Sequence, residues 1–460
     1  MKRKYCILSI IISAALLAGC LSACGESGTA TGGSSSDENT AATVTGGDAA
    51  TIALSGQSAT ATGTGAEVTD GMVTITAGGT YVVTGTMTEG RILVNAPKEE
   101  VTLVLQDAAI TCSTGSPLYV YKSKATTLYL PEGTASTLTD GTDYTFSDSY
   151  SSAEEEEPNA CLYSKSDLVI AGSGSLTVNA NYNNGITGKD TLFIQKASVT
   201  VTAVNHGING KDSLTIKDAD ITVTSGGDAL RSTNDSDPTL GYLVITGSAL
   251  KLTAGEDGIQ AETTLTISGG TATVTTAGGA GQSISDDTSA KGLKAGTQVT
   301  VTGGTFQLNC CDDAIHSNGD GTIDCDGSAT ITGGIVVAAG STGMAENFGT
   351  ASTQGSILVN LSGSAGQTIT LKDSDGNILA SFTPAKAFGC VVVSAPGVAQ
   401  GGTYTIAAGS ASTTVTMESL IYGSGMGGFG GMGGGMGGPG NIGGGQQPPQ
   451  GGMGGPDNRG

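Results

Sequence analysis

The sequence predicts an all-β protein: a right-handed parallel β-helix, a solenoid with coils of about 22 residues, followed by a small antiparallel β-sandwich-like domain. Two observations carry this prediction. The segment NGITGKDTLFI (184–194) returns 22 residues later as HGINGKDSLTI (206–216). Within each copy apolar and polar residues alternate, which is the period of a β-strand and not of a helix.

The N-terminus reads MKRKYCILSIIISAALLAGC, a basic start followed by a short apolar run. Because this run is too short to span a membrane and ends in small residues, it predicts a lipoprotein signal peptide over residues 1–20. LAGC and LSAC both resemble a bacterial lipobox, so the lipidated residue is expected to be Cys20, with Cys24 as the alternative. An ordinary cleaved signal is the other interpretation. We expect a lipid-anchored protein on the extracellular face of the cell membrane.

Low-complexity segments flank the repeats. Residues 21–50 lack an apolar period and are expected to form a disordered tether. The Gly- and Met-rich residues 424–460 cannot bury a core and are expected to be a disordered tail. Between them, residues 51–354 are assigned to the β-helix. Residues 355–423 break the period and are assigned to the small antiparallel domain.

An apolar residue after Gly or Ala anchors each coil of the predicted β-helix. The anchors are Ile186, Ile208, Leu230, Ile259, Leu293, Ile315 and Met344, continued less cleanly upstream by Ile92, Leu118 and Leu162. Polar insertions account for the longer intervals between anchors. A fixed period with insertions is typical of a solenoid, and parallel connections favour a right-handed path.

The charge balance restricts the classes of partner. Asp and Glu number 41 against 19 Lys and Arg, for a net charge of −22. This excess argues against nucleic acid or an anionic membrane surface as a partner. It also leaves many carboxylates available for divalent cations.

Five carboxylates gather at one corner of the predicted coils, just before the anchors. These candidate metal ligands surround Lys291 and are Asp228, Glu256, Asp257, Asp312 and Asp313. One interpretation is that Lys291 is their counter-ion and that Asp and Asn side chains close corner turns. The other places Ca²⁺ between the coils, held by carboxylate and backbone oxygens. We favour calcium because the acids outnumber the lysine.

A polar, partly basic column follows the anchors by one position. Its candidate carbohydrate-binding members are Arg231, Gln260, Lys294 and His316. Next to a floor of Gly and Ala, such a column suits a long anionic polymer. Ordinary solvated side chains are the alternative explanation.

Several motifs together resemble the clostridial carbohydrate-binding parallel β-helix lipoproteins, which are related in fold to pectate lyases. They are NYNNGITGKD, GEDGIQAETTLTISGG, SAKGLKAGTQVTVTGGTF and DDAIHSNG. The resemblance covers about residues 50–420. It implies a β-helix that binds calcium and a polysaccharide, either cellulose or an acidic polyuronate, without established catalysis. This chain departs from the pattern where Asn184 and His206 replace Asp, which puts calcium at the first coils in doubt.

Two alternatives to non-catalytic binding stay open. A pectate-like lyase would use Ca²⁺ as electrophile and a base chosen from Lys291, Lys294 and Arg231. A lysine among carboxylates keeps its proton, which is wrong for a base, so binding is preferred. A passive cell-surface adhesin or spacer would need no site.

The anchor leads to the first prediction. Replacing Cys20 and Cys24 together with Ser removes both lipidation candidates and should release the protein from the membrane fraction into the medium. Immunoblots of the two fractions measure this. Unchanged membrane retention of the double variant would contradict the lipid anchor.

Overall fold

The computed structural model describes residues 49–278, 289–315, 321–325, 328–341 and 347–423. These belong to one compact unit, Gly47–Gly460. The expected signal peptide, nearly all of the tether and the tail lie outside the described residues. Every regular element in the described part is a strand. It contains no helix with the length and apolar character needed to cross a membrane.

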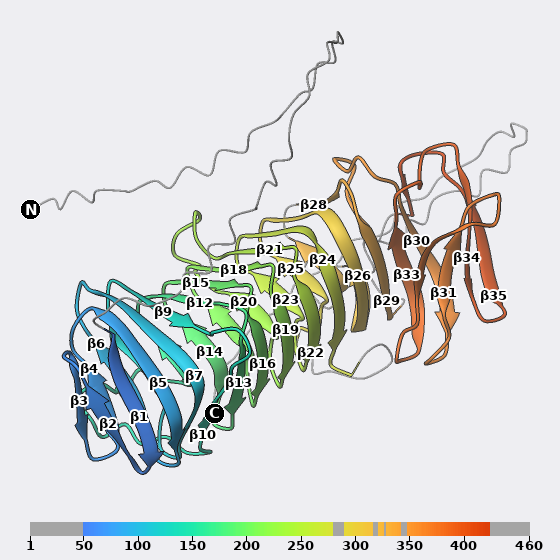
Figure 1. Ribbon diagram of the computed structural model, residues 1–460. Coiled ribbons are helices and arrows are strands. Elements are labelled where there is room, and N and C mark those ends of the chain that lie inside the picture. The colour runs from blue at the N-terminus through green and yellow to red at the C-terminus, as the bar shows by residue number, and fades with distance from the viewer. Residues whose placement is uncertain (1–48, 279–288, 316–320, 326–327, 342–346, 424–460) are drawn as a thin grey trace, which may run out of the picture. The chain divides into compact units, whose positions relative to one another are not determined.

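Consecutive strands fall in turn into three stacks of parallel strands, which we call sheets 1, 2 and 3 (Figure 1). Sheet 1 contains β4 (Met72–Ile75), β6 (Arg91–Asn95), β8 (Leu118–Lys122), β11 (Ala160–Ser164), β14 (Asn184–Gly188), β17 (Ile208–Gly210), β20 (Leu230–Ser232), β23 (Ile259–Ala261), β25 (Leu293–Ala295) and β27 (Gly321–Cys325). Each of these pairs in parallel with its neighbour in this order.

Sheets 2 and 3 complete the coils. Sheet 2 contains β9 (Ala125–Tyr129), β12 (Asp167–Ala171), β15 (Thr191–Gln195), β18 (Ser213–Lys217), β21 (Tyr242–Thr246) and β28 (Ser328–Ile331). Sheet 3 contains β10 (Ala135–Asp140), β13 (Ser175–Ala180), β16 (Ser198–Ala203), β19 (Asp220–Ser225), β22 (Ala249–Ala254) and β29 (Ile335–Ser341). Both sheets share the long strands β5 (Gly79–Met87), β7 (Glu100–Cys112), β24 (Thr264–Thr276) and β26 (Gln298–Ile315).

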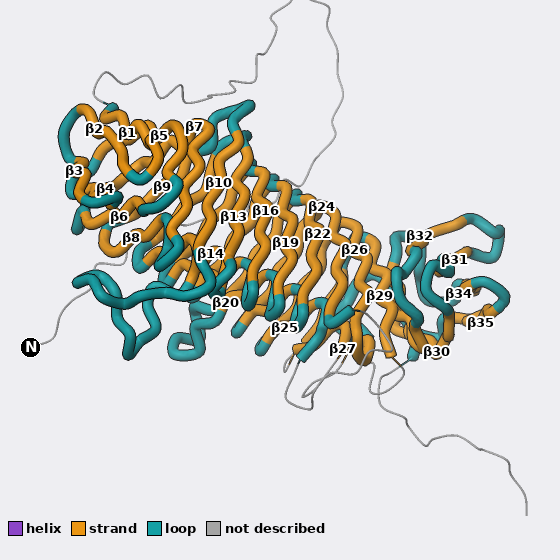
Figure 2. The backbone as a smooth tube through the Cα atoms, turned by 90° about the horizontal axis from the view of Figure 1, so that it is seen from below, coloured by secondary structure: helices purple, strands orange, loops and turns teal. Residues whose placement is uncertain are grey.

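Figure 2 shows the strands of sheet 3 running side by side through the coils. A chain that visits three parallel sheets in rotation is consistent with the parallel β-helix predicted from the repeat; its handedness stays a prediction. The structure is all-β in its described part, as predicted.

The two ends of the stack carry antiparallel strands. At the N-terminal end, β1 (Ala50–Gly56) pairs antiparallel with β2 (Ser58–Thr62), and β3 (Ala66–Thr69) with β4. At the other end lie β30 (Ser356–Gly363), β31 (Ile369–Lys372), β32 (Ile378–Phe382), β33 (Phe388–Ser394), β34 (Thr403–Ala408), β35 (Ala411–Thr416) and β36 (Ile421–Tyr422). β31, β32, β34 and β35 form a separate sheet. β33 pairs antiparallel with β29 in the last coil. This pairing covers a strand edge that would otherwise expose unpaired backbone groups.

Apolar anchors stack in register through sheet 1. Ile208 pairs with Ile186 on one side and with Leu230 on the other, and all three side chains are fully buried. The upstream anchors Ile92, Leu118 and Leu162 continue the same series. Burial of a Leu or Ile side chain contributes about 1.5–3 kcal/mol. Repetition of this contact in every coil therefore supplies a continuous core.

The anchor series changes after Leu293. The register pairs Leu293 with Ile323 of β27 and not with Ile315, which itself lies opposite Ile323. The predicted alignment of Ile315 was therefore wrong by one strand. The last predicted anchor, Met344, lies outside the described residues.

The small residue before the anchors from Ile186 onward has a steric cause. A Cβ on Gly207 would lie 2.4 Å from Cγ1 of Val223 in sheet 3 and 2.6 Å from the carbonyl oxygen of Ala229 in the next coil. Gly185 meets the equivalent neighbours, with Val201 Cγ1 at 2.3 Å. The first strand residues of sheet 1 thus pack directly against sheet 3, which explains why the repeats keep Gly or Ala here.

This contact leads to a stability prediction. Gly207→Ala should lower the free energy of unfolding by about 1–3 kcal/mol, because the added methyl overpacks the core. Gly188→Ala is the matched control in β14, since a Cβ there meets only Leu192 Cβ at 3.5 Å and the Asp190 carbonyl at 3.9 Å. Urea unfolding of both variants measures the effect. Equal losses in the two variants would contradict the packing argument.

Candidate functional site

A ladder of side-chain acceptors joins the coils at the corner that precedes sheet 1. Oδ1 of Asn184 accepts the N–H of His206 at 3.2 Å, and Nδ1 of His206 accepts the N–H of Asp228 at 3.0 Å. Oδ1 of Asp228 accepts the N–H of Asp257 at 3.0 Å, and Oδ1 of Asp257 accepts the N–H of Lys291 at 2.8 Å. Each member therefore satisfies a backbone donor of the following coil.

Cations from the next column neutralise this ladder. Arg231 Nη1 lies 3.2 Å from Oδ2 of Asp228, and Lys294 Nζ lies 3.1 Å from Oδ2 of Asp257. Ser289 also donates to Asp257 at 2.7 Å. The expected counter-ion, Lys291, is 3% exposed and contributes its backbone N–H to Asp257. Among these contacts, the cation paired with Asp257 is Lys294.

The two neighbouring carboxylates Asp228 and Glu256 differ in their ionisation. Burial acts most strongly on the pKa of Asp228 and raises it, but the contacts with His206, Arg231 and the Asp257 N–H together hold that pKa below its usual value. The pKa of Glu256 is raised by burial and by the negative charge of Asp228. The corner therefore holds a buried charged carboxylate beside a second one that is harder to ionise.

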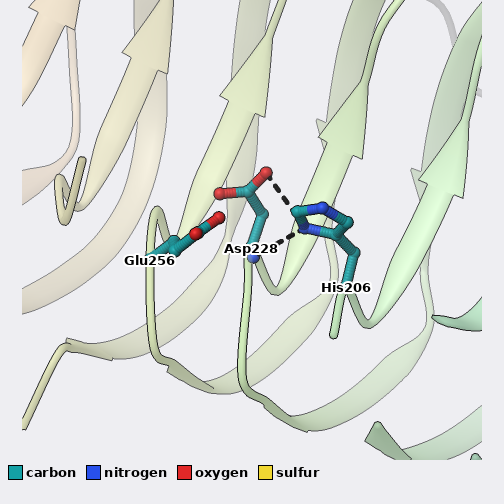
Figure 3. A group of neighbouring side chains, drawn as sticks. All are labelled: His206, Asp228 and Glu256. Carbon is teal, nitrogen blue, oxygen red and sulfur yellow. Dashed lines mark hydrogen bonds and ion pairs between the residues drawn. The ribbon is translucent and has the colours of Figure 1, made fainter. Parts of the chain in front are cut away.

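His206, Asp228 and Glu256 converge from three successive coils (Figure 3). One ligand atom of each lies within 4.8 Å of the others. The structure thus brings together two of the predicted metal ligands, Asp228 and Glu256, with a histidine that was not predicted as a ligand. The predicted ligands Asp312 and Asp313 lie in β26, and their side chains are outside the described residues.

The donor set fits calcium poorly in the described part of this corner. Ca²⁺ takes six to eight oxygen ligands. Both carboxylate oxygens of Asp257 already hold Lys294, Ser289 and a backbone N–H, and one oxygen of Asp228 holds a backbone N–H. The remaining candidate ligands, near Asp228 and Glu256, include the imidazole of His206. Calcium at Asp312 and Asp313 stays a prediction.

The predicted carbohydrate-binding column is partly assembled. Arg231, Gln260 and Lys294 stand in register on β20, β23 and β25, and all three are half-buried. The next residue in register is Asp324, because β27 and not the predicted strand follows β25. His316, the fourth predicted member of the column, lies outside the described residues, and its place in the column stays a prediction.

A polar groove of about 370 Å³ crosses β11, β14, β17 and β20 at the same edge of sheet 1. Its lining consists of amides, hydroxyls, cationic side chains and one imidazole, without a carboxylate. The residues are Asn159, Tyr163, Asn183, Asn184, Thr187, Lys189, Asn205, His206, Asn209, Lys211, Arg231 and Thr233. The asparagines were visible in the repeats, and Arg231 was predicted as a binding residue.

Buried polar atoms of the groove residues that have no hydrogen-bond partner in the structure include Oγ1 of Thr187, whose residue is 3% exposed, and Nε of Arg231. A buried polar atom without a partner costs about 1–3 kcal/mol. A ligand that supplies an acceptor or donor here would recover part of that cost.

The insertion before β11 is fastened to the groove by Glu157. Its carboxylate pairs with Lys165 and with the groove residue Lys189, each at 2.6 Å. Burial raises the pKa of Glu157, but the hydrogen bonds from the two lysines outweigh it and lower the pKa to about 2. The insertion that separates β10 from β11 thereby positions Lys189.

Comparison with known proteins gives a family and two relatives. A family described as carbohydrate-binding domain-containing protein matches residues 69–343. A protein of Acetivibrio thermocellus with the same description is 42% identical over 201 residues, which cover 44% of this chain and 69% of that protein. A solved structure described as the polysaccharide lyase-like protein from C. thermocellum, a gadolinium derivative, is 30% identical. It covers 62% of this chain and 96% of its own, with a TM-score of 0.47.

The Glu157 contacts predict a pH-dependent stability. Because the folded pKa of about 2 lies below the usual 4.5, Glu157 stabilises the fold fully above pH 4.5 and loses this effect as the pH falls towards 2. Glu157→Gln should therefore lower Tm at pH 6, and the difference from wild type should shrink between pH 4.5 and pH 2.

Thermal unfolding across this pH range measures the difference. Glu154→Gln is the control, because this neighbour in the same insertion is exposed. A loss of Tm in Glu157→Gln that is the same at every pH would rule out an ionic origin.

Proposed function

Because the chain belongs to the family of carbohydrate-binding domain-containing proteins, we propose that it binds an acidic polysaccharide, such as a polyuronate, in the polar groove across β11, β14, β17 and β20. The observation that carries the proposal is the lining of that groove: amides, hydroxyls and cations without a carboxylate. The polymer is held without being cleaved.

The charge of the groove favours an anionic sugar. The whole chain carries a net charge of −22, yet Lys189, Lys211 and Arg231 meet at this one edge. Charge-assisted hydrogen bonds from these groups to a carboxylate are about twice as strong as neutral ones. Asn and Thr side chains supply both donors and acceptors, which suits sugar hydroxyls.

The stacking of the coils supports an extended ligand. Neighbouring strands of a sheet lie about 4.8 Å apart, so a groove over four coils presents its polar groups at regular intervals. Beyond it, Gln260 and Lys294 continue the register of Arg231 over two further coils. A chain lying along the stack would meet equivalent positions in turn.

The contacts of the candidate bases support binding without catalysis. Arg231 is paired with Asp228, Lys294 with Asp257, and Lys291 is almost fully buried. An ion pair with a carboxylate favours the protonated form of a cation, whereas a base that abstracts a proton must be neutral. A lyase thus remains the alternative outcome of the test, not a second proposal.

Calcium is not needed at Asp228 and Asp257 for this proposal, since the carboxylates there are paired with cations of the chain. The right-handed coil and the lipid anchor complete the proposed picture of a binding protein held at the outer face of a cell membrane. Their support is the repeat and the N-terminal sequence.

Removal of one groove cation tests the proposal. Lys211 lines the groove and makes no ion pair among the described residues. Lys211→Ala should weaken polygalacturonate binding about tenfold, the equivalent of about 1.4 kcal/mol for one charge-assisted contact. Lys217→Ala is the matched control, since this exposed lysine of sheet 2 is not among the residues lining the groove and its loss should leave binding unchanged.

Isothermal titration with polygalacturonate and with a soluble neutral glucan measures the affinities at two salt concentrations. Binding should be stronger for the uronate and should fall with salt. Preference for the neutral glucan would favour a cellulose-type ligand, and no binding of either would favour a spacer. Release of an unsaturated product that absorbs in the ultraviolet would replace binding by lyase activity.

A further inference from the structure

We infer that His206, Asp228 and Glu256 form a site for a first-row transition-metal dication, with Zn²⁺ as the representative ion, which binds in exchange for the guanidinium of Arg231. This site borders the polar groove and shares His206 and Arg231 with it, but metal can bind there without sugar. The three side chains come from successive coils and converge at the corner of sheet 1 (Figure 3).

The backbone around the site is fixed. His206 is held by Asn184, and Asp228 uses Oδ1 for the N–H of Asp257, so Oδ2 of Asp228 remains directed at the site. Nδ1 of His206 lies 3.3 Å from that Oδ2. Glu256 makes no side-chain hydrogen bond that the structure records among the described residues. Two of the ligands are thus held in place by the ladder, and the third is available to turn towards a metal ion.

Arg231 marks where a cation is stable. Its Nη1 lies 2.5 Å from Nε2 of His206 and 3.2 Å from Oδ2 of Asp228. Yet the corner holds two carboxylates, Asp228 and Glu256, for this one guanidinium, whose Nε is buried without a partner. A dication would neutralise both carboxylates, and the released guanidinium would regain hydration.

Two hydrogen-bond donors point at the imidazole of His206, one at each ring nitrogen. The N–H of Asp228 points at Nδ1 and Nη1 of Arg231 points at Nε2, but a neutral imidazole has only one acceptor nitrogen. One of the two donors is therefore always unsatisfied. A metal ion would take the one acceptor nitrogen of the ring and displace the guanidinium of Arg231.

The ligand types select the class of metal. One imidazole and two carboxylates with an open fourth position suit Zn²⁺ and its neighbours, whereas Ca²⁺ and Mg²⁺ prefer oxygen alone. With bonds of about 2.1 Å, ligand atoms on a tetrahedral zinc lie about 3.4 Å apart. The three ligand atoms, now within 4.8 Å of one another, must therefore draw together by roughly 1 Å. A turn of the half-buried Glu256 side chain supplies this movement.

Displacement of Arg231 by a metal ion would also affect the polar groove. Arg231 lines both the metal corner and the polar groove. Its release places a free guanidinium at the groove, where an anionic ligand is proposed to bind. Metal and uronate would then bind with positive cooperativity.

The test uses the full chain, freed of metal by a chelator and studied without sugar. Titration with Zn²⁺ should give one site per chain, and Co²⁺ should give the visible absorption of a tetrahedral site. His206→Asn should weaken binding at least tenfold while keeping the fold, because Asn184 makes the same backbone contact one coil earlier. His316→Asn, which removes the other of the two histidines, should bind like wild type.

Arg231→Ala should bind Zn²⁺ about tenfold more tightly than wild type, because nothing has to be displaced. Circular dichroism and Tm verify that each variant is folded. Equal Zn²⁺ affinity in wild type and His206→Asn, or absence of binding in both wild type and Arg231→Ala, would overturn the site. Since no sugar is present, either result leaves the proposed polysaccharide binding to its own experiment.

Discussion

The in-register stacking of equivalent corners is the constraint on which the rest of this structure depends. Parallel strands pair residue for residue, so whatever occupies one position in a coil must be compatible with its equivalents above and below. For the anchors this yields a column of fully buried Ile and Leu. For the position before the anchors from Ile186 onward it favours a small residue, because sheet 3 and the next coil lie within 3 Å of a Cβ added at Gly185, Gly207 or Gly258. At the position before that, four successive coils carry a hydrogen-bond acceptor, from Asn184 to Asp257.

The acceptor column explains why the site lies where it does. Asn184, His206, Asp228 and Asp257 each bind the backbone N–H of the following coil. Amide, imidazole and carboxylate can all fill this role, so the chain can vary charge along the column without losing the contact. The first coils use neutral acceptors and border the polar groove. The later coils use carboxylates and recruit Arg231 and Lys294 as partners.

The sequence predicts stacking far better than it predicts contacts. Letter-for-letter similarity between coils aligned Ile186, Ile208, Leu230, Ile259 and Leu293 correctly, because equal spacing means equal register. After Leu293 an insertion precedes β27, and similarity then selected Ile315 where the structure pairs Ile323. The alignment of the repeats showed the column of carboxylates. It did not show that these carboxylates accept hydrogen bonds from backbone N–H groups of the next coil. That contact depends on the direction of each side chain, which the spacing of residues in the sequence does not reveal.

The same reasoning separates Asp257 from the two carboxylates of the inferred metal site. Asp257 has every strong contact that a carboxylate needs, from Lys294, Ser289 and the Lys291 N–H, and a metal there would have to break all of them. Asp228 keeps one oxygen for the coil and presents the other to a cation. Glu256 stands outside the ladder, with a pKa raised by burial and by Asp228. His206 is the one imidazole among the four acceptors of the ladder. At this coil the carboxylates of Asp228 and Glu256 therefore lie near a nitrogen ligand. A position fixed by folding can thus gain a binding role through one change of residue type, because the backbone contact holds the new side chain in place.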